Sequence, residues 1–334
     1  MRSNRPPVTT TPAQQKVQSR RLDRAGVWVL SLLVGMARAI PERLLFALAD
    51  LVGQAVYLWC GPDFLNVRRN LRTAFRDAPD ERIRELARAY WRHLARALAE
   101  ACRLALWTRD DVQTRIELQD VALLESLKAR KCGVIVASGH LGSWEVGPYA
   151  FALLGYPLKL LHDPGTVAPL FDFVNQERRR SGMEVLSKLT HPWALKHLLD
   201  RGAWLCIACD VRASRRGDQI PFFDVLCSSY LGAVSLQKVA RCPIVVTSTA
   251  RMPDGRHKLH VWKIIEYTEQ PTLLRQPLRR TMREVHRALE EAIRAYPEQW
   301  FWHYDRWRSR PILDAASDDD VPPRVPDNRW LTVN

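Results

Sequence analysis

The feature that most constrains the fold is a short apolar run that ends in a glycine-bounded turn and gives way to a helical pattern. Residues 132–138 read CGVIVAS, which is typical of a buried strand in a sheet covered on both faces. The residues that follow, GHLGSWEVGPYAFALLGY, change from small turn residues to helical periodicity. In α/β proteins, ligand sites lie beyond the carboxyl ends of strands at such changes. The sequence therefore predicts a functional site directly after residue 138.

Several other segments have the composition of buried strands, and helical patterns lie between many of them. These candidate strands read PLKLL, MEVLS, AWLCIAC, PIVVTSTARM and KLHVWKII. Strands that alternate with helices favour a mainly parallel sheet flanked by helices, and 334 residues are enough to bury a substantial core. The predicted fold class is α/β.

The N-terminal part predicts a membrane-associating segment. Residues 1–24 are basic and aperiodic, which indicates a flexible leader. Residues 26–59 then form two apolar helical stretches interrupted at Pro41, each shorter than the ~20 apolar residues of a spanning helix. Arginines at their edges favour an interfacial or partly inserted anchor. Two buried core helices are the alternative. A secretory signal peptide is disfavoured, because no small-residue cleavage site follows.

The positive net charge of the chain implies an anionic partner. The chain has 50 Lys and Arg residues against 36 Asp and Glu, a formal charge of +14, which suits acidic lipid, acidic protein or nucleic acid. Tryptophans and arginines alternate near residues 300–310, but no nucleic-acid motif accompanies them. The same residues suit a bilayer interface, so we expect a membrane and no nucleic acid.

The seven cysteines indicate a reducing compartment, because their number is odd and they are scattered through apolar segments. Cys206 and Cys209 form a C-x-x-C, but they lie in an expected buried strand and no second pair at zinc spacing accompanies them. We interpret them as structural residues.

The turn after the first strand carries candidate catalytic residues. Transfer of an acyl group to a hydroxyl needs a base, and the imidazole of His140 has a suitable pKa. Glu145 lies five positions later, which on a regular helix would place it on another face, so the two can meet only across an irregular turn. Gly139 and Gly142 allow such a turn, with Glu145 starting the helix and orienting or charging the ring.

Other chemistries do not match this segment. GHLGSWE lacks the G-x-S-x-G elbow of serine hydrolases, and it is not the HExxH of zinc proteases, so we expect no metal. No serine or cysteine has an activating context, which predicts direct transfer without an acyl-enzyme.

GHLGSWEVGP resembles the HX4(D/E) block of the lysophospholipid acyltransferase superfamily, in the form found in lipid A lauroyl/myristoyl acyltransferases. Four further blocks resemble that family in its order, so that the resemblance covers residues 26 to 311: VRRNLRTAF, PLFDFVNQERRRSGMEVLSK, PFFDVLCSSYLGAVSLQKVARCPIVV and PEQWFWHYDRWRSRP. The resemblance implies a glycerol-3-phosphate acyltransferase-like fold. It also implies an enzyme on the cytoplasmic face of the bacterial inner membrane that moves acyl chains from acyl carrier protein to a hydroxyl of a lipid A precursor, without a cofactor.

The resemblance also implies site residues. His140 would be the base and Glu145 its partner, while Arg178 and Arg180 match positions that bind phosphate or stabilise the transition state. A solvated helix face is the alternative for these two arginines. The segment CDVRASRRGDQIPFFD matches a further family pattern at the site-proximal or substrate-binding positions Asp210, Arg216 and Gly217, and at Phe222 and Phe223, which we expect to pack or line an acyl groove. Val211 and Asp224 depart from that pattern.

Departures in the last block leave alternatives open. Tyr304 and Asp305 stand where the family has a basic pair, so the acceptor could be another glycolipid or aminolipid, with acyl-CoA as donor. A non-catalytic lipid-binding member is a third possibility, disfavoured by the intact His140 and Glu145. The predicted organisation is a leader (1–24), a membrane-associating segment (25–61), an acyltransferase domain (62–312) and a disordered tail (313–334).

Overall fold

A computed structural model describes residues 26, 28–61, 64–162, 168–180, 182–213, 217–269 and 275–308. Within helices, the side chains of residues 168–173 and 275 are also outside the description. The leader and tail expected at 1–24 and 313–334 lie outside the described residues.

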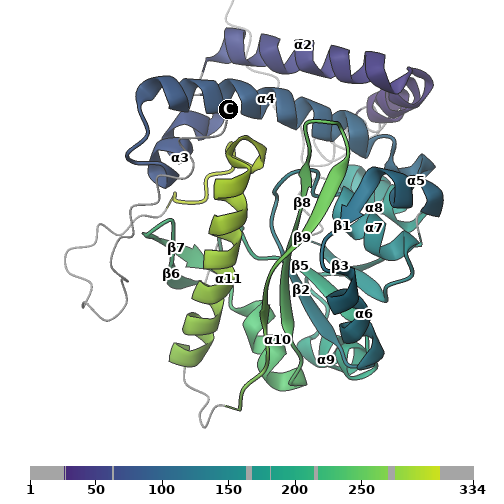
Figure 1. Cartoon of the computed structure of the whole chain (residues 1–334), viewed down its shortest axis with the longest axis vertical. Coiled ribbons are helices and arrows are strands. Elements are labelled where there is room, and N and C mark those ends of the chain that lie inside the picture. Colours follow the sequence, from purple (N-terminus) through teal and green to yellow (C-terminus); the bar gives the residue numbers. More distant parts are fainter. Residues whose placement is uncertain are drawn as a thin grey trace, which may run out of the picture.

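A seven-stranded sheet forms the centre of the molecule, in the order β1-β9-β8-β2-β5-β3-β4 (Figure 1). The five strands β8, β2, β5, β3 and β4 run parallel, and β9 and β1 run against them. The strands are β1 (Ile116–Leu118), β2 (Val134–Ser138), β3 (Leu158–His162), β4 (Glu184–Ser187), β5 (Trp204–Ala208), β8 (Ile244–Arg251) and β9 (His257–Ile265). The mainly parallel sheet is confirmed.

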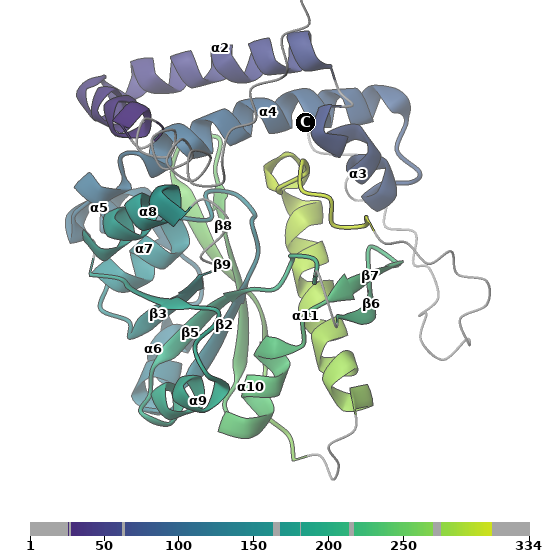
Figure 2. The same ribbon diagram turned by 180° about the vertical axis from the view of Figure 1, so that it is seen from behind.

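Helices cover both faces of this sheet because its central strands are apolar on both sides. In β2, Ile135 and Ala137 join one buried cluster, and Val134 and Val136 join another. The first cluster packs against α9 (Pro192–Asp200), α10 (Gly232–Ala240) and α11 (Arg275–Ala295). The second packs against α5 (Arg109–Arg115), α6 (Val121–Ala129) and α7 (Val146–Leu153), with α8 (Ala168–Arg180) beside α7 (Figure 2).

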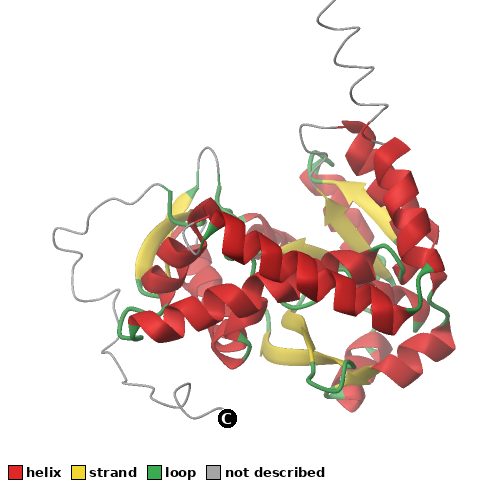
Figure 3. Cartoon of the chain, turned by 90° about the horizontal axis from the view of Figure 1, so that it is seen from above, coloured by secondary structure: helices red, strands yellow, loops and turns green. Residues whose placement is uncertain are grey.

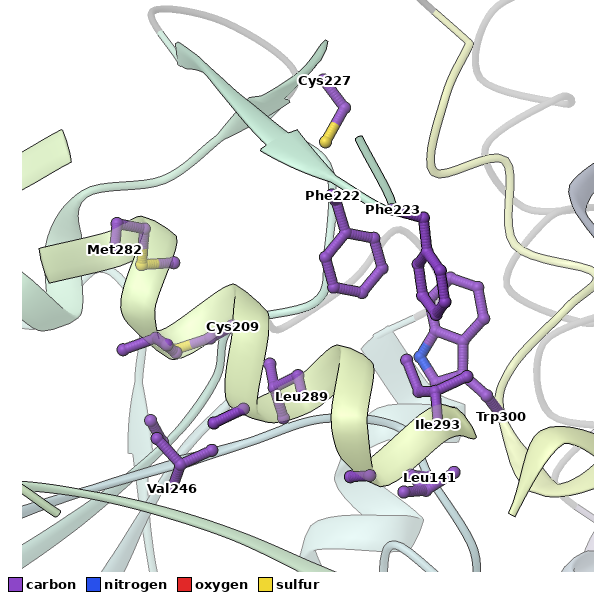
Figure 4. Close-up of a cluster of buried hydrophobic side chains, with 14 of the residues drawn as sticks. Leu141, Cys209, Phe222, Phe223, Cys227, Val246, Met282, Leu289, Ile293 and Trp300 are labelled. Carbon is purple, nitrogen blue, oxygen red and sulfur yellow. The ribbon is translucent and has the colours of Figure 1, made fainter. Parts of the chain in front are cut away.

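A separate antiparallel hairpin lies against α11. It consists of β6 (Asp218–Phe222) and β7 (Val225–Ser229). Figure 4 shows Phe222 and Phe223 at the end of β6, near Trp300 and above α11, which contributes Met282, Leu289 and Ile293 to the same buried cluster. The hairpin thereby extends the core beyond the main sheet.

The N-terminal helices form a layer across the end of the molecule. A helix at Trp28–Ala39 is followed by α2 (Glu42–Cys60), and α2 packs on α4 (Asp80–Ala101) (Figure 1). Figure 3 shows the molecule from above, from the side of this helical layer. Close packing is possible because a Cβ at Gly53 would lie 2.5 Å from the carbonyl oxygen of Trp91. Between α2 and α4 lie the short 3-10 helix Phe64–Asn66 and α3 (Val67–Ala74). A second 3-10 helix, Leu104–Leu106, follows α4, and a third, Pro297–Gln299, follows α11.

The two helices interrupted at Pro41 are confirmed, and most of their apolar side chains face outward. In α2, Leu45, Ala49 and Gly53 are buried against the fold. The exposed apolar residues of the two helices include Trp28, Val29, Leu32, Leu33, Leu44, Leu51, Val52, Leu58 and Trp59. By length and composition α2 could cross a membrane, although it was expected to be too short. Two buried core helices are not what the structure shows.

The predicted strands are confirmed, and three features were missed. β1 is only three residues long, the β6–β7 hairpin lies in a segment interpreted only as a family block, and the antiparallel direction of β9 was not predicted. A hairpin connection of five residues between β8 and β9 requires antiparallel strands, because a parallel pair needs a crossover of a dozen or more residues.

Candidate active site

Residues 139–145, here called the catalytic turn, leave the carboxyl end of β2 and lead into α7. The turn is irregular, as expected. Gly142 has φ +63°, and a Cβ there would lie 1.9 Å from the carbonyl oxygen of Thr249. A Cβ at Gly139 would lie 3.0 Å from a carboxylate oxygen of Asp210. The two glycines therefore let the turn pass close to β8 on one side and to the end of β5 on the other.

His140 is held by Asp210. The Nδ1 atom of His140 lies 3.0 Å from Oδ1 of Asp210, and the backbone N–H of His140 donates to Oδ2 over 2.6 Å. The Asp210 side chain is 3% exposed, whereas that of His140 is 29% exposed. When Nδ1–H donates to the carboxylate, Nε2 keeps its lone pair and can act as a base.

The electrostatics of this pair favour the imidazolium. Burial alone would lower the pKa of His140, but the charge and hydrogen bond of Asp210 outweigh it and raise the pKa, helped by Glu145. Burial alone would likewise raise the pKa of Asp210, but His140 and the indole of Trp300 lower it. Asp210 therefore stays ionised and stabilises a proton on the ring.

Glu145 immediately precedes α7 and pairs with Arg178 of α8. The Nε atom of Arg178 donates to Oε2 of Glu145 over 2.9 Å, and its Nη1 lies 3.1 Å from Nδ1 of His162. The two charged side chains are mostly buried, at 16% and 12% exposed. Glu145 influences the ring of His140 by its charge, while the hydrogen bond that orients the ring comes from Asp210.

Aromatic rings surround the His140–Asp210 pair. The ring of Phe301 stacks on His140 with centroids 5.2 Å apart, and Trp144 packs edge-on against Phe301. The indole N–H of Trp300 donates to Oδ2 of Asp210 over 2.9 Å. Figure 4 shows Trp300 and Leu141 within a cluster of buried side chains, so the site lies on packed side chains. His303 is a further ring near His140. Burial and the charge of His140 lower the pKa of His303 to about 4, so its imidazole is neutral at neutral pH.

The remaining expected site residues are dispersed. Arg180 is half exposed and donates to Glu177 over 2.6 Å, on the outer side of α8. Arg216 lies outside the described residues. Gly217 immediately precedes β6, and a Cβ at Gly217 would lie 2.1 Å from Oγ of Ser228. Phe222 and Phe223 are buried in the core, which confirms the packing interpretation.

Four contacts of the site were not predicted: the Asp210–His140 pair, the Glu145–Arg178 pair, the hydrogen bond from Trp300 and the stacking of Phe301. The sequence contains one indication of the Asp210–His140 pair, because both residues directly follow apolar runs that predict buried strands. In the structure β2 and β5 are neighbours, with Ser138 opposite Ala208. Which strands are neighbours is a tertiary fact that strand patterns do not give.

Cys206 and Cys209, the residues of the C-x-x-C, are buried core residues. Burial raises the pKa of Cys206 to about 12 and also raises that of Cys209, so both stay as thiols at neutral pH. Among the described residues, no group of three or more His, Cys, Asp or Glu side chains could hold a metal ion.

Comparisons with known proteins show which proteins the chain is similar to. The family model described as "Bacterial lipid A biosynthesis acyltransferase" matches residues 13–309. A lipid A biosynthesis palmitoleoyltransferase of Escherichia coli (strain K12) is 22% identical over 252 residues, which are 75% of this chain and 80% of that protein. A lipid A biosynthesis acyltransferase of Shigella flexneri matches with the same identity and coverage.

Proposed function

Since the chain belongs to the bacterial lipid A biosynthesis acyltransferase family and is an acyltransferase, we propose that it moves a fatty acyl chain from acyl carrier protein to a hydroxyl of a lipid A precursor. His140 is the general base in this proposal. The observation that carries it is the hydrogen bond between Nδ1 of His140 and the buried carboxylate of Asp210, which leaves Nε2 as the basic nitrogen. The sheet and its helices are consistent with a glycerol-3-phosphate acyltransferase-like fold.

The reaction needs one proton carrier and no covalent intermediate on the protein. The acceptor hydroxyl gives its proton to Nε2 of His140 as its oxygen bonds to the thioester carbonyl carbon. The carbon–sulfur bond then breaks, and the departing thiolate takes the proton from the imidazolium. The raised pKa of His140 and the ionised Asp210 stabilise the imidazolium between these two steps.

Arg178 and Glu145 support the same step. In this proposal the guanidinium of Arg178, fixed by the carboxylate of Glu145, stabilises negative charge on the thioester oxygen or on a substrate phosphate. The pairing also accounts for the buried position of Glu145. Arg180, Arg216 and Gly217 are kept as proposed positions for binding the anionic substrate, and a side chain at Gly217 would collide with Ser228 and Ala213.

The proposed location is the cytoplasmic face of the bacterial inner membrane. The exposed apolar side chains of the helix Trp28–Ala39 and of α2 support it, because a soluble surface rarely gathers so many. The proposed partners, acyl carrier protein and a phosphorylated lipid, are acidic and suit the net charge of +14.

The test is an acyl-transfer assay in detergent, with radiolabelled acyl–acyl carrier protein and a Kdo-bearing lipid A precursor. We expect label in the lipid with the wild-type protein, and His140→Ala to lower turnover by ~10²-fold or more, the usual scale for loss of a general base. Lys131→Ala, an exposed residue at the other end of β2, is the matched control and should keep wild-type turnover.

Other results would contradict parts of the proposal. Near-normal turnover by His140→Ala would exclude it as the base. A stable acylated protein after addition of donor alone would exclude direct transfer. If label moved only from acyl-CoA, or only to another glycolipid or aminolipid, the donor or acceptor would be wrong while the class of reaction would hold.

A further inference from the structure

A second charged cluster is buried next to the catalytic turn, and the reaction does not use it. Glu100 of α4 accepts a hydrogen bond from Nη2 of Arg251 over 2.7 Å, and its other oxygen lies 2.8 Å from Nε2 of His257. Arg251 and His257 are cross-strand partners in β8 and β9. All three side chains are less than 10% exposed. They are called the Glu100 cluster below.

The charges in this cluster are costly to bury. Although burial alone would raise the pKa of Glu100, His257 and Arg251 lower it to about 2, so the carboxylate is ionised at neutral pH. A buried ion pair contributes little more to stability than well-packed apolar residues would. A role beyond stability would explain its presence here.

The cluster reaches the catalytic turn through Ser143. The same Nη2 atom of Arg251 that binds Glu100 lies 3.2 Å from Oγ of Ser143. The backbone N–H of Ser143 donates to the carbonyl oxygen of Thr249 over 3.1 Å. Ser143 is three residues after His140 and two before Glu145, so its position limits the position of both.

Gly142, the residue before Ser143 in the catalytic turn, is bonded by two further residues, His93 and Gln299. Nε2 of His93 lies 3.2 Å from the carbonyl oxygen of Gly142, and burial and the charge of Arg251 lower the pKa of His93 to about 4, which makes it a neutral donor. The N–H of Gly142 donates to the carbonyl oxygen of Gln299 over 2.9 Å. The side-chain amide of Gln299 bonds both backbone groups of Arg251.

We propose that Glu100 is a positioning residue, which fixes the catalytic turn through Arg251 and Ser143 and so places His140 against Asp210 and Glu145 against Arg178. Glu100 contacts neither of these pairs directly. Its effect passes through the Ser143 hydroxyl, which Glu100 contacts itself, and through Arg251, whose Nη2 atom is shared between Glu100 and Ser143. This inference rests on the proposed role of His140 as the base.

Two variants test the role, and a third is the control. Glu100→Gln keeps the shape of the side chain and removes its charge, and Ser143→Ala removes the hydroxyl through which Arg251 and Glu100 both contact the turn. The control is Glu290→Gln, because Glu290 of α11 is also a buried carboxylate paired with an arginine, Arg283. Its contacts lie with Arg283, Arg294 and the N–H of Phe223, away from the turn.

The first measurement is kcat and KM in the acyl-transfer assay, alongside the melting temperature. We expect Glu100→Gln and Ser143→Ala to lower kcat by roughly tenfold to a hundredfold, since small displacements of reacting groups have effects of that size, with KM little changed. Glu290→Gln should keep the wild-type kcat even if its melting temperature falls as much as those of Glu100→Gln and Ser143→Ala.

The second measurement needs no lipid substrate, so it separates failure of this inference from failure of the proposed function. The rate at which diethyl pyrocarbonate modifies His140 is followed against pH by mass spectrometry. His140 is faced by Asp210, Glu145, Arg178 and His303, and Asp210 raises its pKa. If the turn loosens, the midpoint should move to lower pH in Glu100→Gln and Ser143→Ala, but not in Glu290→Gln. Variants of Glu100 and Ser143 that keep both kcat and this midpoint would overturn the inference and leave the cluster a purely structural one.

Discussion

At the scale of residues, the position and charge of His140 are set by Asp210 more than by Glu145. The carboxylate of Asp210 accepts the ring N–H and the backbone N–H of His140, as well as the indole N–H of Trp300. Glu145, which the sequence suggested as the partner of the histidine, is bound by Arg178. One short turn therefore contributes a residue to each of two separate pairs, His140–Asp210 and Glu145–Arg178.

Removal of the Asp210 charge should change the pH dependence of the rate. The base must be unprotonated, so activity is lost as pH falls through the pKa of His140, which Asp210 raises. In Asp210→Asn we expect the acidic limb of kcat/KM to move to lower pH and the plateau to fall ~10²-fold or more. The control is Asp254→Asn, an exposed carboxylate in the β8–β9 turn. An unmoved acidic limb in Asp210→Asn would show that another group titrates.

A substitution at Gly142 should reveal how tightly the turn is packed. Gly142→Ala places a methyl group 1.9 Å from a backbone oxygen in a backbone conformation that favours glycine, whereas Gly255→Ala has φ +86° and no atom within 4 Å. We expect the second to cost about 1 kcal/mol of unfolding free energy and the first clearly more. Denaturant titration measures both. Equal losses would mean that the turn can move away from β8.

At the scale of elements, α2 has two different faces. Its inner face packs on α4, and Phe46 lies under the guanidinium of Arg251, 5.1 Å from ring centroid to Cζ. Its outer face presents apolar side chains. Truncation before residue 62 would therefore uncover α4 as well as remove the proposed membrane contact, so its result would not separate the two effects. Substitutions on the outer face separate them.

Replacement of Leu44, Leu51, Val52 and Leu58 by serine should weaken membrane binding without unfolding the chain. These side chains are 52–67% exposed. We expect the variant to co-sediment less with vesicles of anionic lipid, because less apolar surface enters the interface. The matched control replaces Leu189 and Trp193, which are at least as exposed but lie near α9, at the opposite end of the molecule (Figure 1). Equal loss in both variants would contradict a membrane role specific to α2.

At the scale of the whole molecule, the C-terminal segment joins parts of the fold that are distant in sequence. Arg306 is fully buried, donates to the carbonyl oxygen of Ser228 and to Oγ of Ser229 over 2.7 Å each, and lies over the ring of Phe222. Nearby, Asn70 of α3 donates to the carbonyl oxygens of Trp302 and Tyr304. Asp305, a departure from the family pattern, pairs with Arg69.

Loss of Arg306 should therefore destabilise the chain as a whole. Arg306→Ala leaves two buried acceptors without their donor, at about 1–3 kcal/mol of unfolding free energy each. Urea denaturation followed by tryptophan fluorescence measures the loss, with the exposed Arg308→Ala as control. A variant as stable as wild type would mean that water replaces the guanidinium.

The sequence by itself determined the fold class, the positions of the main strands, the break at Pro41 and the turn that carries His140. These follow from local patterns: runs of β-branched residues, glycines at the turn, and helical periodicity. The resemblance to a family identified Arg178 and Asp210 as site residues without assigning their contacts.

Only the tertiary structure decided which charged groups meet. Asp210 reaches His140 because β5 is the neighbour of β2, and Arg178 reaches Glu145 because α8 packs beside α7. The Glu100 cluster joins α4 to a hairpin more than 140 residues away. Such contacts depend on the order of the strands and on the side of the sheet on which each helix packs. Local sequence patterns determine which face of a helix or strand is apolar, but they do not determine which other apolar face it packs against.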